Sequence, residues 1–194
     1  MTKILVLYYS RHGSVAQLAE QIALGVAQAG AEALLRALPA TDGSQSTVHP
    51  LFLPDELMQA DGFAFGSPVR FGLMAAPLKQ FWDSTGSEWI KGSLINKPAA
   101  VFSSSGSLHG GNEATLLGMM LPLLHHGMLP VGLPYSEPAL HQTQAGGSPY
   151  GASQVTGLSG DRALGKEAKE LAVALGKRLA TMAQILKQAG TQLP

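Results

Sequence analysis

The chain has 194 residues, of which 45% are hydrophobic and 13% are charged, and its 13 Lys and Arg balance 13 Asp and Glu. This neutral balance argues against nucleic acid or an anionic membrane as the main partner, and against a strongly acidic electron carrier. The absence of cysteine excludes disulfides, thiolate metal sites and cysteine nucleophiles. The length fits one α/β domain over residues 1–194 with a buried core.

A sparsely charged surface tends to associate, so we expect part of it to be buried between subunits. The first apolar run begins at residue 4 and is too short for a secretory signal. No run approaches the roughly 18–20 apolar residues of a transmembrane helix. We therefore expect a soluble, cytoplasmic protein with no membrane partner and no nucleic-acid partner.

The first elements predicted in chain order are a strand, a helix and a second strand. The apolar run over 4–9 predicts a buried parallel strand, and the apolar spacing over 14–29 predicts an amphipathic helix ended by Gly30. A second strand fits 32–38, and the polar residues over 40–53 predict an exposed loop. The first loop aims backbone N–H groups and a helix dipole at one point, which suits a phosphate. An ordinary turn without a ligand fits this stretch alone equally well.

The middle of the chain predicts two more strands, each followed by a loop of small residues. The predicted elements are a helical turn over 54–57, a strand over 62–66, a loop over 67–72, a helix after Pro77, a connection over 83–97, a strand over 98–103 and a loop over 104–111.

The last part of the chain predicts two helices around a fifth strand. The predicted elements are a helix over 112–125, a strand over 128–132, an irregular segment over 133–161 and a helix over 163–188. Pro122 should bend the first of these helices or end it early. An irregular segment as long as 133–161 usually has a function or lies in an interface.

Five short strands that alternate with helices indicate a doubly wound parallel sheet in the order 2-1-3-4-5, with helices on both faces. The loops after strands one, three and four meet at the switch in strand order, where such sheets bind their ligands. The dinucleotide fingerprint and the P-loop are both absent. Because Ser10 and Ser14 offer hydroxyl groups instead, the sequence favours the phosphate of a mononucleotide.

Several segments, in this order along the chain, resemble the WrbA family. They are Leu7-Tyr8-Tyr9-Ser10 with Gly13, Phe65-Gly66-Ser67-Pro68 with Arg70-Phe71-Gly72, Val101-Phe102-Ser103-Ser104, His125-His126-Gly127-Met128, and Gly146-Gly147-Ser148-Pro149-Tyr150-Gly151-Ala152. That family is flavodoxin-like and comprises FMN-dependent NAD(P)H:quinone oxidoreductases. The resemblance implies this flavodoxin-like fold, FMN as cofactor, NADH or NADPH as co-substrate, and a quinone as substrate.

The resemblance also implies a set of site residues. The implied FMN-binding residues are Ser10, Arg11, His12, Gly13, Ser14, Val15, Ser67, Pro68, Val69, Arg70, Phe71, Gly72, Ser104, Ser105, Gly106, Ser107, Gly110, Gly111 and His125. The implied substrate-binding residues are Trp89 and His12, and no metal ligand and no catalytic side chain are implied. Family members are typically homotetramers whose active sites are completed by neighbouring subunits.

The implied reaction is a two-electron ping-pong cycle, in which the flavin carries the chemistry and the protein supplies binding and orientation. Two alternatives remain open, namely a one-electron carrier of the flavodoxin type and an FMN-binding regulatory protein without turnover. His12 stands where the family usually has Tyr, Arg11 replaces an apolar residue, and Val69 replaces Thr. These departures leave the nicotinamide preference open.

Some of these residues also fit roles that need no ligand. Arg70 could be a surface charge, Trp89 a packing anchor, and His125 a cap for the carbonyl groups at a helix end. Phe81 and Trp82 are expected in the core.

Overall fold

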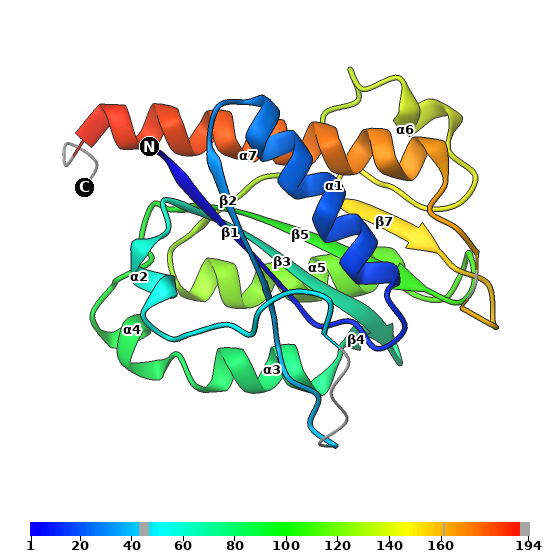
Figure 1. Ribbon diagram of the computed structural model, residues 1–194, viewed down its shortest axis with the longest axis horizontal. Helices are drawn as coiled ribbons and strands as arrows, with labels where there is room; N and C mark the ends of the chain where they lie inside the picture. The colour runs from blue at the N-terminus through cyan, green and yellow to red at the C-terminus, as the bar shows by residue number, and fades with distance from the viewer. Residues whose placement is uncertain (43–46, 161, 191–194) are drawn as a thin grey trace.

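A computed structural model of the protein describes residues 1–42, 47–160 and 162–190. A twisted sheet of mainly parallel strands lies in the middle, with helices on both of its faces (Figure 1). The strands are β1 Lys3–Tyr8, β2 Glu32–Ala37, β3 Gly62–Arg70, β4 Leu73–Met74, β5 Pro98–Ser105, β6 Leu129–Pro130 and β7 Ala152–Val155. Their order, β2-β1-β3-β5-β6, confirms the predicted order 2-1-3-4-5.

The fifth strand of the predicted sheet is divided into two short pieces. Leu129 of β6 pairs with Pro98 at the start of β5, while Ala152–Val155 of β7 pairs in parallel with the end of β5. The prediction of an irregular segment over 133–161 was therefore wrong where β7 lies. It also missed the short helix α6 Ala139–Gln142. Position 161, within that predicted segment, lies outside the described residues.

Two helices cover one face of the sheet and two cover the other. Helices α1 Ser14–Gln28 and α7 Lys166–Ala189 pack on the face that carries Ile4, Val6 and Tyr8. Helices α3 Ala76–Asp83 and α5 Asn112–His125 pack on the face that carries Leu5, Leu7 and Phe65. The alternation of side chains along β1 thus supplies both halves of the core, as expected for a strand buried on both faces.

The strand β3 continues well beyond the predicted end at residue 66. Its last residues pair with β5 as far as Pro68, and Val69 and Arg70 then form an antiparallel hairpin with β4. The turn of this hairpin has positive φ angles at both positions, 52° at Phe71 and 77° at Gly72. Such a two-residue turn matches the twist of the flanking strands. The stretch over 67–72 is therefore a strand end and a tight turn, not a loop.

Other boundaries differ from the predictions by smaller amounts. The connection over 83–97 contains the short helix α4 Gly86–Ile90, and the helical turn predicted over 54–57 is the helix α2 Glu56–Gln59. Helix α5 continues through Pro122 to His125, so the proline does not end it early. The loop predicted over 40–53 lies outside the described residues at 43–46. Within the described residues, every helix is too short or too polar to span a membrane.

Candidate functional site

The loop between β1 and α1 forms one side of the candidate site. Gly13 has a φ of 89°, a conformation that glycine adopts without strain, and its N–H donates to the Ser10 hydroxyl at 3.1 Å. No side chain of the described residues caps helix α1 at this end. The first N–H groups of a helix have no partner within the helix, so they can meet an anion here.

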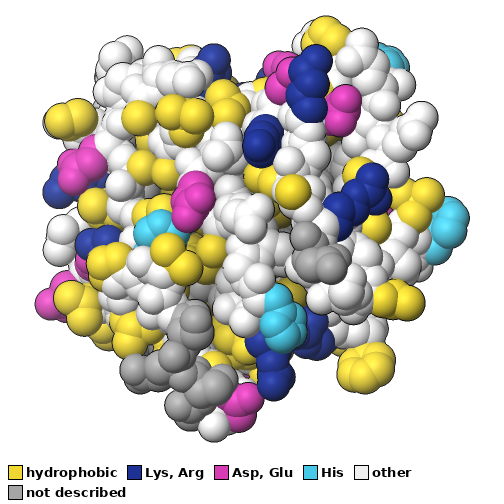
Figure 2. All heavy atoms as spheres, turned by 45° about the vertical axis from the view of Figure 1, so that its right-hand side comes forward, with side chains coloured by type: hydrophobic (Ala, Val, Ile, Leu, Met, Phe, Trp, Pro, Cys, Tyr) yellow, Lys and Arg dark blue, Asp and Glu magenta, His cyan; other side chains and the backbone are white. Residues whose placement is uncertain are grey.

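Ser14 and Ser104 join this loop to the end of β5. Their hydroxyl oxygens lie 3.0 Å apart, although 90 residues separate them in the sequence. A cavity of about 80 Å³ opens between the loops that follow β1, β3 and β5. It is lined by Arg11, His12, Ser14, Pro68, Val69, Arg70, Ser104, Ser105, Gly106, Thr156 and Gly160. Figure 2 shows basic and histidine side chains on this side of the molecule, where the parallel strands end.

The hairpin turn after β3 approaches the loop after β5 closely. A Cβ atom at Gly111 would lie 3.1 Å from the Cα of Gly72, so a larger residue at position 111 would push the two loops apart. Phe71, at the tip of this turn, is fully exposed despite its apolar ring. The positive φ of Phe71 is rare for a bulky residue and costs free energy. An exposed, strained aromatic at this edge is well placed to meet a flat ligand.

Buried polar contacts hold the loop after β5. The Ser105 hydroxyl donates to the carbonyl oxygen of Ser107 and accepts a hydrogen bond from the Asn112 side chain, each at 2.8 Å. Thr156 donates from its N–H and its hydroxyl to the carbonyl oxygen of Ser105, at 2.8 and 3.0 Å. These contacts fix the glycine-rich segment that carries Gly110. They keep its backbone groups in one arrangement for a ligand.

Trp89 and His125 lie elsewhere in the molecule. The indole Nε1 of Trp89 donates to the carbonyl oxygen of His125 at 2.9 Å. His125 ends helix α5, which is about 20 Å long and runs back from the ligand edge to the opposite edge of the sheet (Figure 1). Four residues later, Leu129 pairs with Pro98 at the start of β5. Within one chain, the structure therefore does not bring Trp89 and His125 to the cavity at Ser14 and Ser104.

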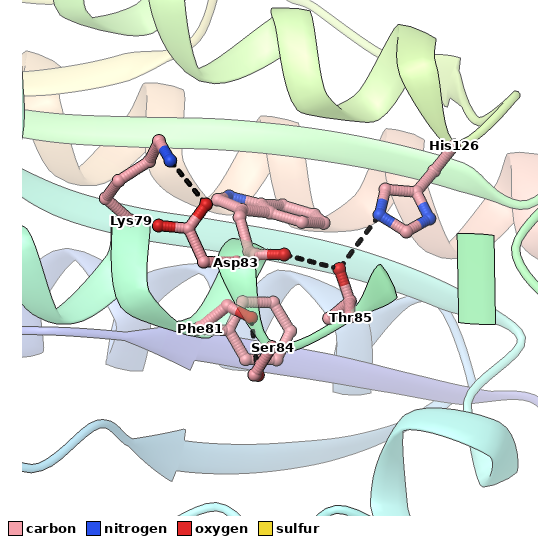
Figure 3. Close-up of polar contacts among 7 residues, drawn as sticks. Lys79, Phe81, Asp83, Ser84, Thr85 and His126 are labelled. Carbon is pink, nitrogen blue, oxygen red and sulfur yellow. Dashed lines mark hydrogen bonds and ion pairs between the residues drawn. The ribbon is translucent and has the colours of Figure 1, made fainter. Parts of the chain in front are cut away.

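Trp89 and His125 share a second, larger cavity of about 550 Å³ between α3, α4 and α5. At its inner side, the Thr85 hydroxyl donates to the carbonyl oxygen of Trp82 at 2.8 Å and lies 2.9 Å from Nε2 of His126 (Figure 3). Since the single hydroxyl hydrogen goes to Trp82, Thr85 accepts a hydrogen bond from Nε2–H of His126. Burial is the main cause that lowers the pKa of His126, so this imidazole is neutral at pH 7.

Phe81 and Trp82 are buried, as predicted from the sequence. Three residues of the first cavity or its support, Asn112, Thr156 and Gly160, were not predicted. Asn112 directly follows Gly110 and Gly111 in the sequence, and this position could have predicted that its side chain supports the loop. Thr156 and Gly160 depend on β7, a strand that the sequence did not reveal. Among the described residues, no group of three His, Asp or Glu side chains could hold a metal ion.

The family model described as NADPH-dependent FMN reductase matches residues 2–137. A protein of Geotalea daltonii named NAD(P)H dehydrogenase (quinone) is 42% identical over 96% of this chain and 99% of its own length. A protein of Geobacter sulfurreducens with the same name is 43% identical over 82% of this chain and 86% of its own length. The family model covers all residues up to position 137 that line the smaller cavity.

Solved structures are similar in fold. A WrbA-like flavodoxin from Agrobacterium tumefaciens superposes with a TM-score of 0.71 at 24% identity, over 95% of this chain and 99% of the other. A flavodoxin from the domain Archaea has a TM-score of 0.65 at 18% identity, over 94% of this chain and 99% of the other. At such identities the likeness concerns the arrangement of helices and strands, which is flavodoxin-like.

Proposed function

This chain belongs to the family of NADPH-dependent FMN reductases and is an FMN-dependent NAD(P)H:quinone oxidoreductase. We propose that residues at two opposite edges of the sheet contribute to this activity. The edge with Ser14 and Ser104 binds the cofactor. The opposite edge, with Trp89 and His125, completes the substrate pocket of a neighbouring copy. When bound, FMN takes two electrons from NAD(P)H and passes them to the quinone.

The cofactor edge fits the polar end and the sugar chain of FMN. The loop over 10–15 offers hydroxyl and N–H groups for the phosphate, and nothing lies within 4 Å of the position that a Cβ atom at Gly13 would take. Val69, Arg70 and Phe71 would line the sugar chain and the ring. The glycine-rich segment after β5 would meet the polar edge of the ring. The contact between Ser14 and Ser104 is the observation that carries this assignment, because it brings two of these loops together.

A shared substrate pocket follows from the separation of the two edges. Trp89 is held by the carbonyl oxygen of His125, yet 55% of its surface is exposed, so its ring is available to another molecule. Around it, α4 and α5 expose Ile90, Leu121 and Leu124 by 79%, 60% and 58%. Apolar exposure of this kind favours association with another copy. We propose a homotetramer in which Trp89 and His125 of one copy face the cofactor of another.

In such a pocket the protein supplies position and protons. The rings of Phe71 and Trp89 would hold a flat quinone between them, which favours transfer through proximity. His125 is exposed and could donate a proton to the reduced quinone. NAD(P)H and the quinone would use this pocket in turn, which gives a ping-pong sequence.

The cofactor assignment is tested by titrating apoprotein into FMN and following flavin fluorescence. NADH and then benzoquinone are added to the complex without oxygen. We expect tight quenching, bleaching by NADH and recovery of colour with the quinone. Binding without bleaching would point to an electron carrier, and no binding would overturn the flavin assignment.

The shared pocket is tested by mixing two variants of reduced activity. One carries Ser14→Ala with Ser104→Ala, which weakens the cofactor edge, and the other carries Trp89→Ala, which removes the opposite edge. If the pocket is shared, subunit exchange between them restores some sites that have both edges intact, and activity returns. Activity that stays at the sum of the separate variants would show that each copy works alone.

A further inference from the structure

A third cavity adjoins the small cavity at Ser14 and Ser104, here called the cofactor cavity, on the side of strand β2. It has a volume of about 320 Å³ and is lined by Tyr8, Ser10, Arg11, His12, Gly13, Ala16, Ala37, Thr47 and Val48. The loops after β3 and β5 do not line it. The loop after β1 lines both cavities, so FMN held by the loops after β1, β3 and β5 would leave open only the side of this cavity that Ala37, Thr47 and Val48 form. Arg11 and His12 line both cavities and stand between them.

The side chains around this third cavity favour an anion. Arg11 lies 3.8 Å from the carboxylate of Asp42, and both side chains are at least half exposed. A surface pair of this kind contributes little, so the guanidinium can turn toward a stronger anion at small cost. His12 is exposed beside it, and no carboxylate is among the described residues that line the cavity.

The floor of the cavity carries no negative charge of its own. The Tyr8 hydroxyl lies 2.7 Å from Nδ1 of His49, and Nε2 of His49 lies 3.6 Å from the Glu20 carboxylate. The Tyr8 hydroxyl and Nδ1 of His49 thus share a hydrogen bond. Burial, and then the charge of Glu20, raise the pKa of Tyr8 to about 12, so its phenol stays neutral.

We propose that this cavity binds the 2′-phosphate of NADPH and gives the enzyme a preference for NADPH over NADH. The inference rests on the proposed function, because the nucleotide must approach FMN at the adjoining cavity. A phosphate monoester is a dianion, and a guanidinium binds it through two parallel hydrogen bonds. NADH has only a hydroxyl group at this position. Arg11 would then contact a phosphate that distinguishes the two nucleotides.

A charge placed on the far wall of the cavity tests this assignment. Thr47 is exposed, lines this cavity and does not line the cofactor cavity. The variant Thr47→Asp puts a carboxylate there, and Thr47→Asn is its uncharged control of the same shape. Calorimetry on the FMN-loaded protein compares adenosine 2′,5′-bisphosphate with adenosine 5′-monophosphate.

We expect the bisphosphate to bind the unchanged protein at least about tenfold more tightly than the monophosphate, since it adds one charge-assisted contact. Thr47→Asp should remove most of this difference, and Thr47→Asn should keep it. Equal affinity for the two nucleotides, or no effect of Thr47→Asp, would overturn the proposal. Inorganic phosphate that binds as tightly as the bisphosphate would also overturn it, because the cavity would then select any phosphate.

Kinetics separate failure of this proposal from failure of the proposed function. Thr47→Asp should raise KM for NADPH about tenfold and leave the constants for NADH within about twofold. Equal use of NADH and NADPH by the unchanged protein would overturn the phosphate site while the quinone reductase assignment stands. If neither nucleotide bleaches bound FMN, the proposed function fails, and the calorimetric comparison still decides whether the cavity selects the bisphosphate.

Discussion

Gly25 on α1 and Gly176 on α7 each press against the backbone of the other helix. A Cβ atom at Gly25 would lie 2.1 Å from the carbonyl oxygen of Val173, and one at Gly176 would lie 2.1 Å from the carbonyl oxygen of Ile22. Only glycine fits at such a distance. The two helices therefore pack closely on one face of the sheet, which fixes the direction of α1 and of the phosphate loop that precedes it.

Gly176→Ala should destabilise the protein by about 1–3 kcal/mol, because the added methyl group forces the two helices apart. Urea unfolding measures this change. Ala174→Gly, at a partly buried position of the same helix, is the comparison for helix propensity and should cost about 1 kcal/mol. If Gly176→Ala is as stable as the parent, the close packing of α1 on α7 is not required.

Loss of the Ser14 and Ser104 hydroxyls should weaken FMN binding. Each substitution by Ala should raise the Kd by about 2- to 13-fold, since a net hydrogen bond contributes about 0.5–1.5 kcal/mol. Fluorescence quenching during titration measures this. Thr181→Ala removes an exposed hydroxyl far from the site, on α7, and should leave the Kd unchanged. An unchanged Kd in both serine variants would contradict the phosphate assignment.

Phe71→Asn should stabilise the protein and impair quinone reduction. Asn adopts a positive φ more readily than Phe, and the fully exposed ring of Phe71 loses no packing, so a gain of about 0.5–1 kcal/mol is expected. The missing ring should raise KM for benzoquinone. Thermal unfolding and steady-state kinetics of the same preparation measure both effects. A less stable variant would show that Phe71 is not strained in this turn.

The partly buried contact between Arg36 and Glu56 should make stability depend on acid pH. Arg36 donates from Nε to the Glu56 carboxylate at 2.6 Å, and this bond is the main cause that lowers the pKa of Glu56. Stability from a lowered carboxyl pKa is present above the ordinary value and is lost as pH falls through the lowered one. Arg36→Met should cost about 1–3 kcal/mol at pH 7 and much less near pH 3. Unfolding of Glu56→Gln, which has no carboxylate, should show a flatter pH profile.

His126 should contribute a second pH dependence. Because burial lowers its pKa, the stability that its neutral form provides is present above its ordinary value of about 6.5 and is lost as pH falls through the lowered value. Unfolding between pH 7 and pH 5 should show this loss, and Thr85→Val should lower stability at pH 7 by about 1–3 kcal/mol. His126→Gln should flatten the profile. His109→Gln, at an exposed histidine, should follow the parent profile.

The strands and the loops that bear ligands could be predicted because their signals are local. The run over 4–9 is apolar throughout, and the loops after the first, third and fourth strands are rich in Ser, Gly or Pro. The strand order and the ligand-binding end of the sheet therefore followed from the rules for parallel sheets. Strand β7 could not be predicted, since its four residues include Ser153 and Gln154, which are buried only because β5 and α7 cover them. The sequence did not predict that His125 lies, within its own chain, at the end of the sheet opposite Ser14 and Ser104, because the length of α5 decides this and the motif does not.

The divided fifth strand also affects how the protein behaves at high concentration. An uninterrupted edge strand offers a row of free N–H and C=O groups to any passing chain, and such edges promote amyloid-like stacking. Here β6 has only two residues, one of them Pro130, which has no N–H to offer, and the chain leaves the sheet before β7 begins. An incoming strand would find no continuous ladder to extend on this side. On this side of the sheet, the interruption therefore protects a neutral, sparsely charged protein from edge-to-edge aggregation.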